Sequence, residues 1–453
     1  MPNNSIDDSK LSKFQVRTAI YGNGGHLCDG FVLGAIVPAL PIFARSHEMT
    51  PLMSGLIGSS ALFGVFLGSA VFGMVADRIG RRKVFLLGLS AFVVLSLAQF
   101  FVTGPESLFA IRLLLGVFIG AEYAVATTLV AEFAPKKYRA TFLALGPAMW
   151  TVGYVLAIFV GTLMESLGDD AWRWILMTSA IPSLVFLLLR RNTPESPRWL
   201  AAQGRTAEAL EILRAHYSAE ATVEDLKIDE GAGQSGTSAL KTLLSNRYRK
   251  RLAFGCLFWI CQVVPYFGVF MFLPSIITSL GIESGFWQTQ SVNLFLLVGG
   301  VVGILTINLT GRRTYTLISF SLLAASTLAI GLWQSAPTVA VIGLFAVFAL
   351  VSSAMSALDT IYPSEMFPTE VRSTANGICV AASRIGAAVG VLLLPLGVSA
   401  LGAHTTVLIT AGIAALGLLV SIAWAPETAG KSLGSVADLE EDPNGASSAV
   451  HAL

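Results

Sequence analysis

The stretch "GMVADRIGRRKVFLLG", residues 73–88, places a cluster of charged residues between two long apolar runs. It contains Asp77 and Arg78, and three consecutive basic residues follow at 81–83. The motif "GRR" recurs at 311–313, again between two apolar runs. A charged turn that occurs twice between apolar segments suggests a chain that crosses a membrane repeatedly and contains an internal repeat.

Composition supports a membrane protein. Of the 453 residues, 54% are hydrophobic and 13% are charged, and the mean hydropathy is +0.71. Soluble globular proteins carry about 25% charged residues, so the sequence excludes a soluble protein. The net charge of +1 says nothing about partners, because the distribution of the charges matters more than their sum. The expected partners are a small-molecule substrate, protons and the lipid bilayer, and no nucleic acid. The polar first 13 residues lack the pattern of a cleaved signal peptide. The four cysteines match no zinc spacing, so we expect neither a metal nor a cofactor.

Apolar runs of about 20 residues are long enough to cross a bilayer as helices. The sequence therefore predicts an all-α membrane protein with twelve transmembrane helices in two parallel six-helix halves. The expected spans are 18–43, 54–76, 84–102, 108–131, 141–165, 173–190, 252–280, 287–309, 315–334, 338–361, 375–400 and 404–425. The expected regions are an N-terminal tail at 1–17, a first half at 18–190, a polar central loop at 191–250, a second half at 251–425 and a C-terminal tail at 426–453.

The distribution of basic residues predicts the orientation. The connections after spans 2, 4, 8 and 10 hold Arg78, Arg81, Arg82, Lys83, Lys136, Lys137, Arg139, Arg312, Arg313 and Arg372. The loops on the opposite side hold Arg45 and, at a boundary, Arg173. The excess of Lys and Arg in cytoplasmic loops places both termini and the central loop in the cytoplasm.

Three motifs repeat between the halves. "GRR" at 80–82 returns at 311–313, "EFAPKKYR" at 132–139 returns as "EMFPTEVR" at 365–372, and "PES" at 194–196 returns as "PET" at 426–428. The offsets are 231, 233 and 232 residues. One nearly constant offset indicates two copies in parallel orientation, an arrangement typical of transporters that rock around a central site.

These motifs resemble those of the major facilitator superfamily. Residues 73–88 are similar to its Gly-x-x-x-Asp-Arg-x-Gly-Arg-Arg signature. "RLLLGVFIGAEY", "EFAPKKYR", "PESPRWL" and "PETAGKSL" resemble its sugar-porter-like and organic-ion-transporter-like members. The resemblance covers nearly the whole chain. It implies a monomeric twelve-helix alternating-access transporter of the plasma membrane, with a substrate cavity between the halves.

The charged motifs predict a cytoplasmic gate. Several carboxylates at helix ends face several guanidiniums and can form bidentate pairs across the two halves. Such pairs would hold the gate shut in one state and separate in the other; the alternative is that these charges only set the topology. The expected gate residues are Asp77, Arg78, Arg81, Arg82, Glu132, Arg139, Glu195, Arg312, Arg313, Glu365, Arg372 and Glu427.

Ionisable residues within the spans are candidates for proton coupling, because burying them in a membrane is costly. The candidates are Asp29 in span 1, and Arg112 and Glu122 in span 4. The resemblance implies that Arg112 matches the arginine of the sugar porters' proton switch. Asp29 keeps the first acid of a related Asp-Gly-Tyr/Phe-Asp pattern, whose second acid is replaced by Val32. Asp29 and Arg112 are expected to pair, and Asp29 is expected to be the main proton carrier. The alternatives are that Glu122 carries the proton, or that both acids are structural or transport is uncoupled.

Arg384 in span 11 is the most unusual charge, because it lies about ten residues from the nearer end of its span. The resemblance aligns "ASRIG" with organic anion carriers, which suggests a carboxylate-binding arginine; a pair with Asp359 or Glu122 is the alternative. The sugar porters' run of amides in the seventh helix is reduced here to Gln262. Aromatic residues dominate the predicted cavity, so its expected lining is Arg384, Trp150, Tyr154, Gln262, Tyr266 and Phe270.

The sequence thus predicts a secondary active transporter and not an enzyme. Its first hypothesis is proton-coupled symport of a small organic acid, such as nicotinate or a benzoate. The alternative is a proton-coupled sugar or polyol symporter, and export of drugs or organic cations ranks below it. A membrane enzyme lacks sequence support, because the chain contains no phosphate loop and no His-rich cluster.

Overall fold

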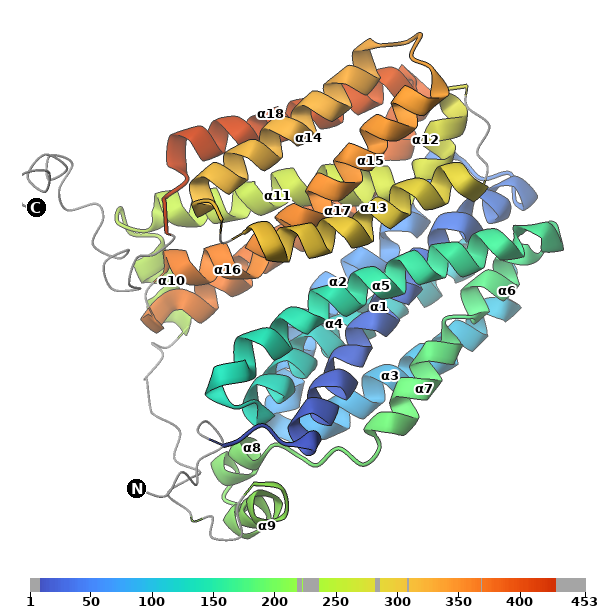
Figure 1. Cartoon of the computed structure of the whole chain (residues 1–453). Coiled ribbons are helices and arrows are strands. Elements are labelled where there is room, and N and C mark those ends of the chain that lie inside the picture. The colour runs from blue at the N-terminus through green and yellow to red at the C-terminus, as the bar shows by residue number, and fades with distance from the viewer. Residues whose placement is uncertain are drawn as a thin grey trace, which may run out of the picture. The chain divides into compact units, whose positions relative to one another are not determined.

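A computed structural model describes residues 9–217, 222, 236–281, 286–307, 309–367 and 369–428. Within these residues every regular element is helical (Figure 1). The helices of the first half are α1 (Lys13–Ser46), α2 (Pro51–Ile79), α3 (Arg81–Ala98), η1 (Gln99–Phe101), α4 (Pro105–Phe133), α5 (Lys136–Met164), η2 (Glu165–Leu167), α6 (Ala171–Met177) and α7 (Ala180–Arg190). Next come α8 (Pro197–Ala202), α9 (Thr206–His216) and α10 (Gly236–Leu243). The second half contains α11 (Arg249–Met271), α12 (Leu273–Ser279), α13 (Phe286–Thr306), α14 (Arg312–Leu332), α15 (Thr338–Met355), α16 (Ala357–Met366), α17 (Thr369–Leu401) and α18 (Ala403–Trp424).

The twelve predicted spans are confirmed. Twelve helical segments of the described chain are long and apolar enough to cross a membrane. Three spans that the sequence predicts as single helices are each built from two. α6 and α7 are separated at residues 178–179, α15 and α16 at Ser356, and α11 and α12 at Phe272. Pro274 favours the last break, because proline cannot donate a helical hydrogen bond and is most readily accommodated in the first turn of a helix, its position in α12.

Local sequence signals determine where the first helices begin. Ser12 and Gln15 form a capping box at the start of α1: the Gln15 N–H donates to Ser12 Oγ at 3.2 Å, and the Ser12 N–H donates to Gln15 Oε1 at 2.9 Å. Thr50 caps α2 by accepting from the Met53 N–H at 3.2 Å, and Pro51 occupies the first turn. These caps satisfy backbone donors that would otherwise lack partners.

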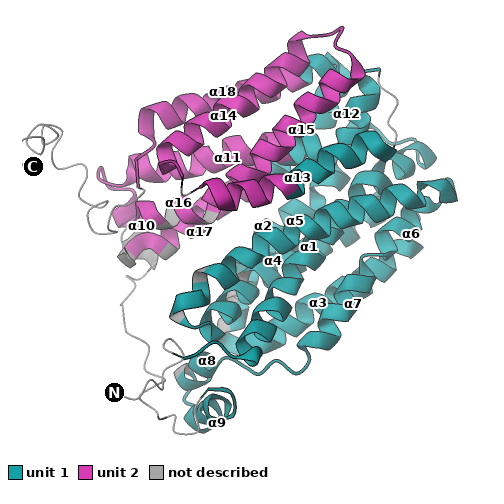
Figure 2. Ribbon diagram, viewed as in Figure 1, with its two compact units in different colours: residues 1–230, 267–297, 387–406 teal, residues 231–266, 298–386, 407–453 magenta. Residues whose placement is uncertain are grey.

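The chain divides into two compact units (Figure 2). Unit 1 comprises Met1–Glu230, Phe267–Leu297 and Ala387–Thr406. Unit 2 comprises Gly231–Tyr266, Val298–Gly386 and Val407–Leu453. In unit 1 the most extensive helix contacts are those of α2 with α4 and of α1 with α5, and in unit 2 α14 packs against α15.

The α2–α4 pair depends on glycine. A Cβ atom added at Gly116 would collide with the backbone carbonyl of Ala61, and one added at Gly68 would collide with that of Val117. The two backbones are therefore in direct contact, as is common where small residues line membrane helix interfaces.

The central polar segment contributes a short helix that packs within unit 1. α9 falls where the sequence shows the amphipathic run "RTAEALEILRAHY". At its end the ring of His216 stacks on Phe14 of α1 at 3.9 Å, and the Tyr217 hydroxyl donates to the Phe133 carbonyl of α4 at 2.9 Å. Burial, together with the nearby charge of Arg17, lowers the pKa of His216. The neutral imidazole that this favours can stack without a charge to desolvate.

Candidate functional site

The charged motifs of the first half form contacts around the start of α3. Arg81 forms a salt bridge with Glu132 at the end of α4. Glu195 follows α7 and accepts from the backbone N–H groups of Arg81 at 3.1 Å and Arg82 at 3.0 Å. The glutamate of "PES" thus caps a helix N-terminus, where unsatisfied N–H groups and the helix dipole favour a negative charge.

The second half repeats these contacts around the start of α14. Arg312 Nε lies 3.3 Å from Glu365 Oε2. Glu427 accepts from the backbone N–H groups of Arg312 at 2.8 Å and Arg313 at 3.2 Å. Thr428 adds a hydroxyl that donates to Glu365 at 2.6 Å. The repeat seen in the motifs is therefore also a repeat of ion pairs and helix caps.

The other arginines of the motifs bind backbone carbonyls. Arg139 donates to the Ala134 carbonyl at 3.2 Å, and Arg372 donates to the Phe367 carbonyl at 3.0 Å, five residues earlier in each case. In the same way Arg82 donates to the Arg191 carbonyl at 2.8 Å and Arg313 to the Ile422 carbonyl at 2.9 Å. These guanidiniums satisfy carbonyls at helix ends.

For two predicted gate residues, Asp77 and Arg78, the structure describes no contact with these ion pairs and helix caps. Asp77 lies in the last turn of α2, and its side chain is outside the described part of the structure. Arg78, one residue on, is exposed. Each ion pair described above joins residues of one unit, so pairs that cross between the two halves stay a prediction.

The predicted proton-coupling residues are all deeply buried in unit 1. Asp29 is 0% exposed, Arg112 is 0% exposed and Glu122 is 1% exposed. The three guanidinium nitrogens of Arg112 have no hydrogen-bond partner among the described residues. The predicted pair of Asp29 and Arg112 is therefore not hydrogen-bonded in this structure. A buried arginine without such bonds is costly and is a candidate for function.

Glu122 pairs with an arginine that the sequence analysis did not single out. Arg190 Nη2 donates to Glu122 Oε1 at 2.6 Å, and both side chains are fully buried. The same guanidinium donates to the carbonyls of Tyr21 at 2.7 Å and Gly22 at 2.5 Å, and it lies over the ring of Phe85 at 3.7 Å. Arg190 thus joins α1, α3 and α4 to the end of α7.

The only sequence signal for Arg190 was its place at the end of span 6, beside Arg191, where basic residues commonly mark a membrane boundary. Its inward direction depends on the packing of α7 against α3 and α1, which the sequence does not specify.

Glu122 Oε2 has no hydrogen-bond partner among the described residues. That oxygen is available to take a proton, so Glu122, like Asp29, remains a candidate proton carrier.

The predicted aromatic lining is partly assembled in unit 1. The rings of Trp150 and Tyr154 stack at 5.3 Å with an angle of 11°, and Phe267 meets Trp150 edge to face at 5.9 Å. The indole nitrogen of Trp150 is buried without a hydrogen-bond partner in the described chain. Such a donor beside aromatic faces can bind a polar ligand oxygen. Phe270 is 1% exposed in the same unit.

The other candidate substrate residues lie in unit 2, on three helices. The carboxylate of Asp359 in α16 has the side chains of Gln262 and Trp259 in α11 as polar neighbours. The guanidinium of Arg384 in α17 acts on the same carboxylate through its charge. Asp359 Oδ1 and Gln262 Oε1 are buried without hydrogen-bond partners among the described residues. We call these four side chains the Asp359 cluster. Tyr266, in the same unit, is 9% exposed.

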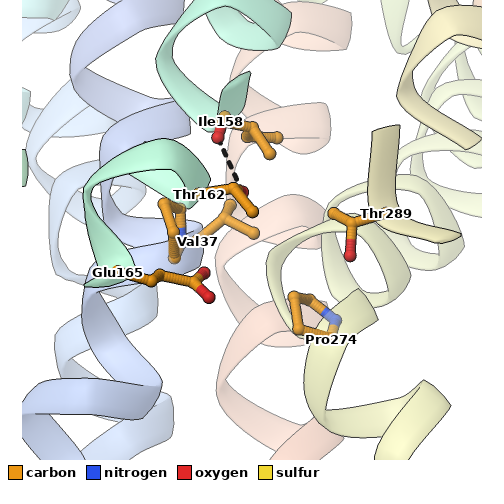
Figure 3. A pocket seen from close by; sticks show the side chains of 7 residues that line it. Val37, Ile158, Thr162, Glu165, Pro274 and Thr289 are labelled. Atoms are coloured by element: carbon orange, nitrogen blue, oxygen red, sulfur yellow. Dashed lines mark hydrogen bonds between the residues drawn. The ribbon is translucent and has the colours of Figure 1, made fainter. Parts of the chain in front are cut away.

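A separate small cavity lies in unit 1 near the opposite ends of the spans from the charged motifs (Figure 3). Its volume is about 30 Å³, enough for one or two water molecules. Figure 3 shows Glu165, Pro274 and Thr289 around the same opening, with the Thr162 hydroxyl donating to the Ile158 carbonyl at 2.9 Å. A cavity of this size holds water rather than a metabolite.

Comparison with known proteins gives consistent results. The family model "Sugar (and other) transporter" matches residues 27–439. The inner membrane metabolite transport protein YgcS of Escherichia coli is 40% identical over 93% of this chain and 94% of its own length. The arabinose-proton symporter of Bacillus subtilis is 26% identical over 97% of both chains. A partially occluded inward-open structure of the xylose transporter XylE from Escherichia coli has a TM-score of 0.79 at 20% identity, covering 93% of this chain and 100% of that chain.

Proposed function

Because the chain belongs to the sugar (and other) transporter family and has the major facilitator fold, we propose that it is a proton-coupled symporter of a small hydroxylated metabolite, a sugar or a polyol. Its relatives include an arabinose-proton symporter and a metabolite transport protein, and neither name indicates an aromatic acid. The relatives therefore favour the alternative of the sequence analysis over its first hypothesis. The inner membrane, with both termini in the cytoplasm, is the proposed location, because basic residues gather on one side.

The Asp359 cluster is the observation that carries the choice of substrate. Arg384 was expected to bind a carboxylate of the substrate, or else to pair with Asp359 or Glu122, and its charge acts on the carboxylate of Asp359. The atoms left without partners in the described chain, Asp359 Oδ1 and Gln262 Oε1, are both acceptors when the carboxylate is ionised. A ligand that fills this cluster must supply donors. Hydroxyl groups do so, whereas a carboxylate would add a further acceptor beside Asp359.

Buried charges in unit 1 support proton coupling. Asp29, Arg112 and Glu122 lie within the spans and away from solvent. An acid in such a place binds or releases its proton when a neighbouring charge or ligand arrives or leaves. We assign Asp29 as the main proton carrier, because Glu122 is already held by Arg190.

A small organic acid is the second candidate. Arg384 retains a permanent positive charge, and the stacked pair of Trp150 and Tyr154 offers a flat aromatic surface. In this case the substrate would take the place of Asp359 as partner of Arg384. The two candidate functions predict different requirements for binding. A sugar or polyol requires Asp359, whereas an organic acid requires Arg384.

Binding to the purified protein separates the two candidates. The thermal unfolding of the detergent-solubilised chain is measured against pentoses, hexoses, polyols, nicotinate and benzoate, and each stabilising compound is then tested for uptake into proteoliposomes. We expect a sugar or polyol to stabilise the protein, and Asp359→Asn to weaken its apparent affinity at least about tenfold, since a hydrogen bond to a charged group contributes about 1.5–3 kcal/mol. Asp170→Asn, a change at a residue whose side chain is 78% exposed, is the matched control.

Stabilisation by an aromatic carboxylate would reverse the assignment of the substrate class. If an aromatic carboxylate stabilises the protein, and this effect is lost in Arg384→Gln but kept in Asp359→Asn, the substrate is an organic acid and the sugar proposal is wrong.

A further inference from the structure

Two thiols from different helices of unit 2 lie together. The Cys256 thiol of α11 donates to Cys379 Sγ of α17 across 4.0 Å. Cys379 is fully buried, whereas Cys256 is partly exposed. The other two cysteines, Cys28 and Cys261, are buried and form no such sulfur pair in the described chain.

The helix backbones also lie close at this point. A Cβ atom added at Gly255 would lie only 2.9 Å from Cys379 Sγ. The missing side chain at Gly255 thus lets α17 approach the backbone of α11 beside Cys256. A disulfide requires Cα atoms about 4.4–6.8 Å apart and side chains that point toward each other. The sulfur contact and the close backbone approach both favour this geometry.

We propose that Cys256 and Cys379 form an oxidisable dithiol, a modification site at which a peroxide converts the two thiols into a disulfide between α11 and α17. The partly exposed Cys256 reacts first: its thiolate sulfur attacks one peroxide oxygen, the O–O bond breaks, and sulfenic acid and water form. The sulfur of Cys379 then attacks the sulfenic sulfur and displaces a second water. The two thiols lose two electrons and two protons, and hydrogen peroxide is reduced to two water molecules.

The dithiol lies close in sequence to residues of the Asp359 cluster, so its oxidation is expected to affect transport. Trp259 lies three residues after Cys256 on α11, and Arg384 lies five residues after Cys379 on α17. Both belong to the Asp359 cluster. A disulfide would fix the spacing of the two helices next to this cluster. Any step that changes the α11–α17 spacing is then blocked, so oxidation slows transport and a thiol reductant restores it.

The chemical test needs no substrate. The full chain in proteoliposomes is treated with hydrogen peroxide, denatured and reacted with a maleimide, and its mass is measured. We expect the number of maleimide adducts to fall from four to two, and a peptide that contains both Cys256 and Cys379 to appear until reductant is added. Cys28→Ser/Cys261→Ser is the matched control. It should retain two reactive thiols before oxidation and none after it, whereas Cys256→Ser and Cys379→Ser should yield no crosslinked peptide.

The functional test uses any compound that the liposomes accumulate. Peroxide should lower the initial uptake rate several-fold in the unmodified chain and in Cys28→Ser/Cys261→Ser, and reductant should restore it. Uptake by Cys256→Ser and by Cys379→Ser should be insensitive. Four maleimide adducts after oxidation, or an equal loss of uptake in Cys379→Ser, would overturn the proposal. The mass measurement stands even if the proposed substrate is wrong, so the two failures can be told apart.

Discussion

Arg190 and Glu122 illustrate how single residues stabilise this fold. Both side chains are fully buried, and the guanidinium also donates to two carbonyls of α1. A buried ion pair contributes little relative to an apolar pair, but removal of one partner leaves an uncompensated charge. The pair therefore stabilises the association of α1, α4 and α7 only as long as both members are present.

We expect Arg190→Leu to destabilise the protein by about 3–5 kcal/mol, because it leaves the Glu122 carboxylate buried without its partner. The double variant Glu122→Leu/Arg190→Leu should recover much of this loss, since neither charge remains. Thermal or denaturant unfolding in detergent measures both effects. Arg191→Leu is the control, as Arg191 is exposed. Equal unfolding midpoints for Arg190→Leu and the control would show that the pair contributes nothing.

At the scale of elements, helix contact and helix termination are specified by different residues. Gly116 and Gly68 allow α2 and α4 to meet backbone to backbone. Glu195 and Glu427 satisfy the first N–H groups of α3 and α14. The first feature is steric and the second electrostatic, so they respond to different substitutions.

Gly116→Ala should destabilise the protein by about 1–3 kcal/mol, the usual cost of overpacking, because the new methyl group has no room beside Ala61. Gly412→Ala in α18 adds the same methyl group where nothing lies within 4 Å. It should be neutral or slightly stabilising, because alanine is the better helix former. Unfolding temperatures of the two variants are compared directly, and a similar fall in both would contradict the contact between α2 and α4.

Glu195→Gln should destabilise the start of α3, because the amide loses the charge that the helix N-terminus favours and one of its two acceptor oxygens. The expected loss is about 0.5–2 kcal/mol, the range for helix caps. Glu208→Gln, at an exposed surface pair with Arg205, should leave the unfolding midpoint unchanged. Hydrogen exchange of the amides of Arg81 and Arg82 is the more local measurement. Unchanged protection there would show that Glu195 is not the cap.

Much of this element-level description could be predicted from the sequence. Apolar run length specifies the twelve spans, and the repeated motifs predict the duplicated contacts that the structure contains. The break before Ala180 and the inward direction of Arg190 could not be predicted in this way. They depend on packing between segments far apart in the chain, and a run of apolar residues does not specify that packing. The neighbours of Arg384 were open for the same reason, because Asp359, on which its charge acts, lies on another helix.

At the scale of the whole molecule, the chain combines two kinds of polar site within an apolar protein. The duplicated charged motifs lie at helix ends, whereas Asp29, Arg112 and the Asp359 cluster lie within or at the ends of the spans. A purely structural protein would gain stability by replacing these buried charges with apolar side chains. Their presence is expected in a transporter that moves protons together with its substrate.

Proton-driven accumulation in proteoliposomes tests the central claim most directly. Purified protein is reconstituted, an inward proton gradient is imposed, and uptake of the sugar or polyol found in the binding screen is followed. The wild-type chain should accumulate it above the equilibrium level, and collapse of the gradient should abolish the excess. Asp29→Asn should lose this accumulation but retain exchange of labelled for unlabelled substrate, while Asp170→Asn behaves as wild type. Accumulation that is unaffected both by collapse of the gradient and by Asp29→Asn would contradict proton-coupled symport by this protein.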